Sequence, residues 1–157
     1  MEVPEDPEPE YVKFSPDGSQ IAVTLQENNA VVIVDAATLE ATASWSAGEV
    51  TVTGINTVRD GEINLDSSIT APREPDSIGW VDNHHVATAN EGDWKGGTRG
   101  WSIFEASTGN VVWDAGNTLE YLTISHGHWP EKRADKKGIE PEGLVVVGHD
   151  VVVTDWG

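Results

Sequence analysis

Three triplets of the form acidic-proline-acidic recur along the 157-residue chain and are its strongest candidates for chemistry. They start 66 residues apart, and they are Glu8-Pro9-Glu10, Glu74-Pro75-Asp76 and Glu140-Pro141-Glu142. Proline favours the first position of a strand, and residues two apart in a strand share a face. The two carboxylates of a triplet can therefore point the same way. Carboxylates that converge repel one another unless a proton or a hard cation lies among them.

One hypothesis is therefore an oxygen-ligand site for Ca²⁺ or Mg²⁺. It would take one carboxylate from each triplet and further acidic side chains that follow later strands, namely Glu10, Asp76 and Glu142 supported by Glu27, Glu91 and Asp93. The segment Asn90-Glu91-Gly92-Asp93 suits cation ligation because its glycine permits an unusual backbone between oxygen-bearing side chains. The alternative hypothesis is that the triplets are solvated turns of a structural repeat. We expect no organic cofactor.

The only basic cluster of the chain comes just before the third triplet and consists of Arg133, Lys136 and Lys137. Such a cluster could hold a phosphate or sulfate group beside a metal, or it could simply balance local charge. In a phosphoesterase, carboxylates would hold the cation, water would attack phosphorus, and a basic side chain would stabilise the developing charge. The candidate catalytic residues are Glu140, Glu142, Arg133 and Lys137.

The composition of the chain excludes several classes of protein. With 9 Lys and Arg against 27 Asp and Glu, the formal net charge is -18, which disfavours nucleic acids and anionic membrane surfaces as partners. The absence of cysteine excludes disulfides and thiolate metal sites. No apolar run reaches about 18 residues, so we expect no membrane insertion. The first residues, Met1-Glu2-Val3-Pro4, lack the basic and apolar regions of a signal peptide.

The residues after each triplet predict short antiparallel strands. Runs rich in Val, Ile, Thr and Trp alternate with turns rich in Asp, Asn, Gly and Pro, which is typical of an all-β fold. Each of the first two repeats contains four such runs, and the third contains two: 11–14, 21–25, 30–34 and 39–45; 77–80, 86–89, 100–104 and 110–114; 143–147 and 151–154. Four strands per repeat are the make-up of a β-propeller blade.

This pattern predicts a domain organisation. Residues 1–7 form a disordered acidic N-terminus, and residues 8–157 form a partial β-propeller. Within the propeller we expect a blade at 8–45, a loop at 46–73, a blade at 74–114, a loop at 115–139 with at most one helical turn, and a half blade at 140–157. About two and a half blades cannot close a ring, which typically needs four to eight. We therefore expect a fragment of a longer propeller, or a protomer that completes the ring by self-association.

The sequence also resembles the choice-of-anchor I β-propellers. The matching segments are 7–12, 23–30 with Val34-Asp35, 59–64, 88–93, 101–104, and Arg133 with 135–143. The resemblance implies a secreted or surface-attached ring of about seven blades. Some relatives are labelled alkaline phosphatase-like and others mesenchyme-specific cell-surface glycoprotein. Family members usually carry a long insertion after the Asn-Glu-Gly-Asp motif, where this chain has only Trp94 to Arg99.

Two functions follow as expectations. The first is an extracellular or cell-surface scaffold that binds an unidentified ligand or protein partner, since no complete catalytic constellation is present. The second is a divalent-metal-dependent phosphoesterase with its carboxylates on the propeller axis, which the acidic triplets beside a basic cluster favour.

Overall fold

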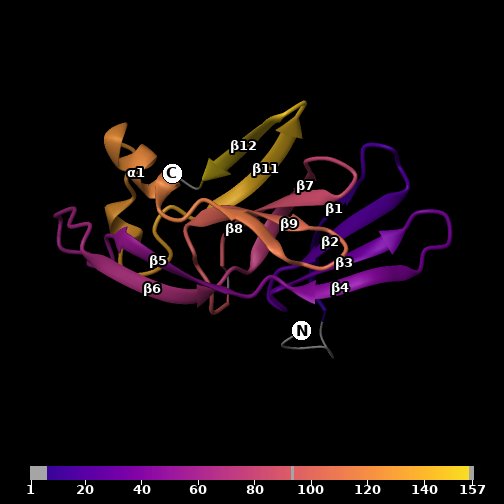
Figure 1. Cartoon of the computed structure of the whole chain (residues 1–157). Coiled ribbons are helices and arrows are strands. Elements are labelled where there is room, and N and C mark those ends of the chain that lie inside the picture. The colour runs from indigo at the N-terminus through magenta and orange to yellow at the C-terminus, as the bar shows by residue number, and fades with distance from the viewer. Residues whose placement is uncertain (1–6, 93, 156–157) are drawn as a thin grey trace.

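The computed structural model of the chain describes residues 7–92 and 94–155 and consists mainly of antiparallel strands (Figure 1). The first sheet has the order β1-β2-β3-β4, and the second has the order β10-β9-β8-β7. Their strands are β1 (Pro9–Phe14), β2 (Gln20–Leu25), β3 (Ala30–Asp35), β4 (Ala41–Ser46), β7 (Pro75–Trp80), β8 (His85–Asn90), β9 (Gly100–Glu105) and β10 (Val111–Asp114). The strands β11 (Pro141–Val147) and β12 (Asp150–Asp155) form a separate hairpin.

The predicted all-β fold and the ten predicted strands are thus confirmed, with shifts of one or two residues at their ends. Across 7–92 and 94–155 the sheets do not close into a ring. The N-terminus predicted to be disordered covers residues 1–7, of which residues 1–6 lie outside the described residues. Among the described helices, none is long and apolar enough to cross a bilayer.

Aspartate side chains fix several of the turns that separate these strands. The carboxylate of Asp17 accepts hydrogen bonds from the backbone N–H of Ser19 and from the hydroxyls of Ser15 and Ser19. The carboxylate of Asp35 accepts the N–H groups of Ala37 and Thr38 in the same way. These donors lower the pKa of both carboxyls, because they favour the charged form. The aspartates of the predicted turns are therefore held in the charged carboxylate form that accepts the hydrogen bonds of each turn.

The sheets stack on one another through two separate apolar cores. The core between the first and second sheets contains Val31, Ile33, Trp80 and Phe104, with Trp45 packed on Phe104 at a ring-centroid distance of 5.0 Å. The core between the second sheet and the β11–β12 hairpin consists mainly of small and β-branched residues from both sides: Ala87, Ala89, Leu144, Val146, Val151 and Val153. Three successive sheets therefore bury their facing sides.

The long connections between the repeats differ from the sequence-based expectation. Residues 46–73, predicted as a loop, contain the hairpin β5 (Glu49–Ile55) and β6 (Ser67–Pro72). The reason is the alternation of Val50 and Val52 with threonines, a period-2 pattern that suits a half-buried strand. The second connection contains helix α1 (Thr118–Ser125) and the short 3-10 helix η1 (Glu131–Arg133).

These two connections pack together at one end of the molecule, shown at the left of Figure 1. The side chain of Asn117 donates hydrogen bonds to the carbonyls of Thr53 and Gly54, which ties the start of α1 to β5. The carboxylate of Glu131 accepts the N–H groups of Asp60 and Gly61 from the β5–β6 turn. We call residues 49–72 and 117–138 the connector lobe.

Candidate functional site

The three acidic triplets begin neighbouring strands, as side-chain bridges between those strands demonstrate. The hydroxyl of Thr24 accepts the N–H of Tyr11 at 3.0 Å and donates to the carbonyl of Asp76 at 2.7 Å, which links the starts of β1 and β7. The hydroxyl of Ser77 accepts the N–H of Leu144 at 3.0 Å and donates to its carbonyl at 3.3 Å, which links β7 to β11. The triplets therefore lie in sequence along one end of the stacked sheets.

The first acidic residue of each triplet has a different environment. Glu8 is exposed, whereas Glu74 is buried and its two carboxylate oxygens accept the N–H groups of Trp94 and Lys95, each at 2.7 Å. Glu74 also adopts a left-handed backbone with φ of 44°. Since a side chain held by two backbone amides is fixed, Glu74 orders the glycine-rich loop after β8 and does not face outward as a ligand.

Glu140 is buried in the corresponding position of the third repeat and is neutralised by the basic cluster. Its carboxylate forms an ion pair with the guanidinium of Arg133, and Lys137 Nζ lies 3.8 Å from its second oxygen. Two of the side chains considered for binding phosphate are thus engaged with a carboxylate of the same chain. The arrangement matches the local charge balance that the sequence left open as the alternative.

Glu142 and Glu91, two residues of the predicted acidic site, lie near enough to each other to interact electrostatically. Burial raises the pKa of Glu142, and the nearby charges of Glu91 and Glu140 raise it further, while the positive charge of Arg133 opposes them. The side-chain amide of Gln26 donates to Glu91 at 2.7 Å and connects this group to the first sheet. Glu142 of the third repeat therefore interacts electrostatically with Glu91 of the second repeat and with Glu140 of its own repeat.

The remaining predicted ligands that the structure describes do not complete a metal site with Glu91 and Glu142. Glu10 is exposed on β1, and Asp76 and Glu27 are each half-buried, while Asp93 lies outside the described residues. Among residues 7–92 and 94–155, no group of three or more His, Asp or Glu side chains is arranged to hold a metal ion. The described donors alone therefore form no preformed Ca²⁺ or Mg²⁺ cage, which takes several oxygen ligands at once.

A buried ion pair that sequence reasoning missed positions the loop before Glu140. Arg99 Nη1 lies 3.0 Å from a carboxylate oxygen of Glu120, and both side chains are almost completely buried. Arg99 also donates to the carbonyls of Asn56 and Ala134, at 2.7 and 2.8 Å. Burial raises the pKa of Glu120, against the opposing effects of the Asn56 N–H and the Arg99 charge.

This pair joins the connector lobe to the glycine-rich loop, and within the lobe it joins α1 to the segment that carries Arg133. Gly138 has a φ of 61°, and a Cβ there would lie 2.9 Å from the guanidinium of Arg99, so only glycine fits this approach. The sequence offered one signal, a lone Arg within the glycine-rich loop. No local periodicity could have predicted its partner.

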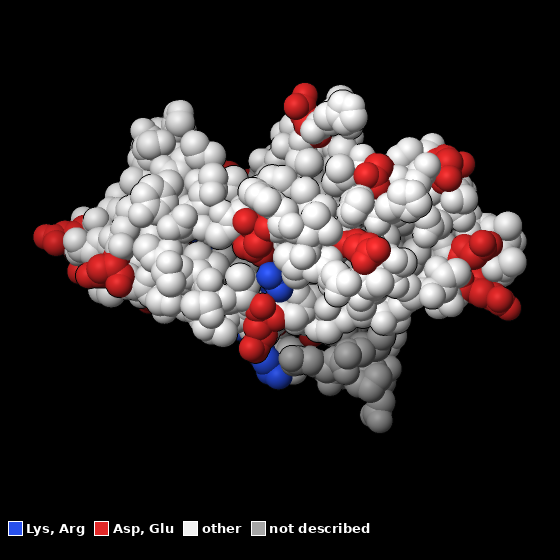
Figure 2. Space-filling model, in the orientation of Figure 1, with Lys and Arg blue, Asp and Glu red and all other residues white. Residues whose placement is uncertain are grey.

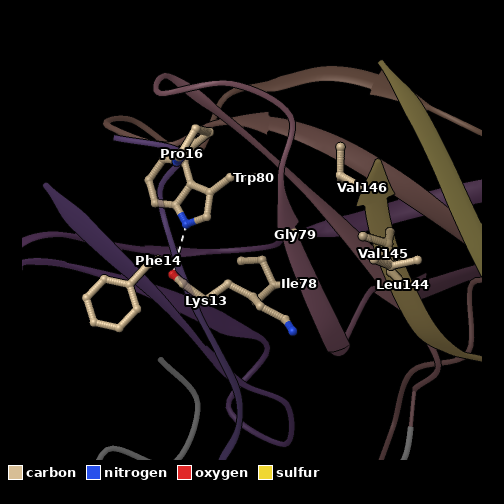
Figure 3. A pocket seen from close by; sticks show the side chains of 9 residues that line it. All are labelled: Lys13, Phe14, Pro16, Ile78, Gly79, Trp80, Leu144, Val145 and Val146. Carbon is tan, nitrogen blue, oxygen red and sulfur yellow. Dashed lines mark hydrogen bonds between the residues drawn. The ribbon is translucent and has the colours of Figure 1, made fainter. Parts of the chain in front are cut away.

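An apolar groove lies near the other ends of β1, β7 and β11, where these three strands approach one another (Figure 3). The indole N–H of Trp80 donates to the carbonyl of Lys13 at 2.9 Å across this groove. Its lining comes from equivalent positions of the repeat: Lys13, Phe14, Pro16, Ile78, Gly79, Trp80, Leu144, Val145 and Val146. The 66-residue spacing read from the triplets therefore holds along the whole strands.

The surface of the protein is acidic. Acidic side chains are spread over the face shown in Figure 2, and few basic side chains appear among them. This distribution agrees with the net charge of -18 and gives the face no basic patch that could bind a polyanion.

Comparison with protein families finds one family model that matches nearly the whole chain. The model of the Choice-of-anchor I domain matches residues 2–96 and 94–153. The two matched segments meet in the glycine-rich loop after β8, where the sequence resemblance located a missing insertion. Choice-of-anchor domains typically occur in secreted or surface proteins. No curated protein sequence matches the chain.

Proposed function

Because the chain belongs to the Choice-of-anchor I domain family, we propose that it supplies consecutive blades of a secreted or surface-attached β-propeller that acts as a binding scaffold. The observation that carries the proposal is the positional repeat of the stacked sheets. Residues 66 positions apart, such as Ile78 and Leu144, occupy equivalent places in successive cores. Propeller blades are four-stranded sheets of this kind arranged around a central channel.

The connector lobe is the part of the scaffold that we assign to partner binding. Loops held on a rigid framework are common binding surfaces, and the Arg99–Glu120 pair holds this one. Exposed apolar side chains on the lobe lie among acidic ones: Val58, Ile63, Tyr121 and Leu122 with Asp60, Glu62 and Asp66. A partner that matches this surface combines apolar groups with positive charge.

A peptide-binding experiment tests the lobe. A library of short peptides that combine Lys or Arg with Leu or Tyr is screened against the immobilised protein, and the hits are measured by calorimetry. We expect Tyr121→Asp to weaken binding by at least about tenfold, whereas Val112→Asp on strand β10, outside the lobe, leaves it unchanged. Hits that respond equally to both variants, or a library without hits, would overturn the assignment.

A second candidate function, a metal-dependent phosphoesterase, is favoured by one observation. The negative charges of Glu91 and Glu140 and the positive charge of Arg133 all act on the carboxyl of Glu142. A phosphoesterase would need Glu91 and Glu142 to hold a divalent cation that polarises a phosphate oxygen, although the described donors form no preformed cation cage. Arg133 and Lys137 are engaged by Glu140, however, so a substrate phosphate would have to compete with a buried carboxylate. We therefore prefer the scaffold.

The two candidates are separated by an activity assay. The protein is incubated with a chromogenic phosphomonoester and Ca²⁺ or Mg²⁺, in parallel with Glu142→Gln and with the equivalent exposed variant Glu10→Gln. The scaffold predicts no turnover above the rate without protein. Turnover that Glu142→Gln abolishes and Glu10→Gln preserves would replace the scaffold by the phosphoesterase.

A further inference from the structure

The repeat gives every sheet two different faces. In the second sheet, Ile78, Trp80 and Val86 point toward the first sheet, and Gly79 and Ala87 point toward the β11–β12 hairpin. We call the first of these the leading face and the second the trailing face. Within the chain, the leading face of each sheet packs against the trailing face of the sheet before it.

The leading face of the first sheet has the same character but no neighbour among the described residues. Val12 and Phe14 lie 66 positions before Ile78 and Trp80, and they pair across the strands with Val23 and Ile21. Val12 and Phe14 are 58% and 62% exposed, whereas Ile78 and Trp80 are 0% and 6% exposed. Two large apolar side chains that the repeat buries in the second sheet are therefore open to solvent in the first.

The trailing face of the β11–β12 hairpin is open in the complementary way. Val145 and Val152 pair across the hairpin and correspond to Gly79 and Ala87 of the second sheet. Both valines are 49% exposed, whereas Ala87 is 0% exposed beneath the hairpin. The stack therefore has an exposed leading face at one end and an exposed trailing face at the other.

We propose that these two faces dock on each other between two copies of this chain, head to tail. The contact would continue the interface that the chain already forms twice within itself, with Phe14 and Val12 of one copy against Val145 and Val152 of the other. Since the two faces differ, the interface is heterologous and can close into a ring. The inference rests on the positional repeat that also supports the proposed function.

Net charge decides the conditions for this association. Each copy carries a formal charge of -18, so two copies repel each other at low ionic strength. At about 1 M salt the Debye length is about 3 Å, and this repulsion is largely screened while apolar contact persists. The docking is therefore expected to strengthen with salt, unlike an interface made of ion pairs.

Sedimentation velocity on the whole chain in about 1 M NaCl tests the proposal. The wild type should associate with rising concentration. Phe14→Asp removes the leading face and Val152→Asp removes the trailing face, and each should raise the apparent dissociation constant by at least about tenfold. Val112→Asp, which changes an equally exposed valine on β10, is the matched control and should associate like the wild type.

Mixing the two disabled variants gives the decisive readout. Phe14→Asp retains a trailing face and Val152→Asp retains a leading face, so an equimolar mixture should form one-to-one dimers and nothing larger. A wild type that stays monomeric at all concentrations, with a native circular dichroism spectrum, would overturn the docking. Full association of Val152→Asp alone would also overturn it, because leading faces would then dock on each other. Neither result bears on the arrangement of blades within the chain, which distances between spin labels in equivalent turns test separately.

Discussion

The guanidinium of Arg99 and the carboxylate of Glu120 lie 3.0 Å apart in a site from which water is almost completely excluded. The two residues come from the glycine-rich loop and from helix α1, and their contacts reach Asn56, just after β5, and the segment before β11. One ion pair thus joins four parts of the chain that are distant in sequence.

Removing one partner of this pair should destabilise the protein strongly. Glu120→Leu leaves a buried guanidinium without its countercharge, which typically costs about 3–5 kcal/mol of unfolding free energy. The double variant Arg99→Met/Glu120→Leu should recover a large part of that loss, because it removes both charges together. Urea unfolding followed by tryptophan fluorescence measures both values. A double variant that is less stable than Glu120→Leu would contradict this account of the lobe.

The stability of the protein should respond to the Glu142 carboxyl in a defined pH window. Its pKa in the folded state is raised, so the folded protein holds this proton at pH values where the unfolded chain has released it. Stability from this group is therefore present at low pH and decreases as pH rises from the ordinary Glu value to the raised one. Glu142→Gln should raise the midpoint of urea unfolding near neutral pH and should have no effect well below the ordinary Glu pKa.

Glu10→Gln is the matched control for this measurement, because Glu10 is the exposed residue at the equivalent position of the first repeat. Its midpoint of urea unfolding should follow that of the wild type at every pH. An equal gain from both substitutions would mean that only the lowered net charge matters, and not the cluster with Glu91 and Glu140.

The carboxyl of Glu131 should give a pH dependence of stability opposite to that of Glu142. Hydrogen bonds from the N–H of Gly61, the indole of Trp129 and the N–H of Asp60 lower its pKa. Its contribution to stability is then present above the ordinary Glu pKa and lost as pH falls through the lowered one. Glu131→Gln should accelerate hydrogen exchange of the Gly61 amide at neutral pH. Unchanged exchange at Gly61 would show that this bond does not hold the β5–β6 turn.

The indole of Trp80 should stabilise the folded protein through its hydrogen bond as well as through the apolar area that it buries. Trp80→Phe keeps an aromatic ring in the core but loses the hydrogen bond to the Lys13 carbonyl, which typically contributes about 1 kcal/mol. A measurable fall in the urea midpoint is expected for this variant. Trp94→Phe, at an exposed tryptophan, should stay within about 0.5 kcal/mol of the wild type. Equal effects would argue that Trp80 does not bridge the sheets.

The repeated strands could be predicted from the sequence because their causes are local. Short β-branched runs and turns such as that of Asp17 set strand and hairpin over a few residues, and the 66-residue spacing of the triplets gave the repeat. The strand from Glu49 to Ile55 carried the same local signal, an alternation of valine and threonine. It was missed because the segment lay outside the repeat.

The candidate site was less predictable because it depends on contacts between distant segments. The sequence placed acidic residues at neighbouring strand starts, but it could not tell that Glu74 caps two backbone amides or that Glu140 is paired with Arg133. Equivalent residues of the repeat therefore have different environments, because the connections between the repeats supply different partners. The Arg99–Glu120 pair has no sequence periodicity at all.

The distances between equivalent turns test the central claim, the radial repeat of the sheets, most directly. Asp17, Asn83 and His149 occupy the turns between the first two strands of each repeat, 66 residues apart. The chain has no cysteine, so spin labels on paired Cys substitutions at these positions report only the chosen sites. Blades around one axis predict similar distances for 17–83 and 83–149 and a longer one for 17–149. Clearly unequal neighbouring distances, or a 17–149 distance as short as either, would contradict the account.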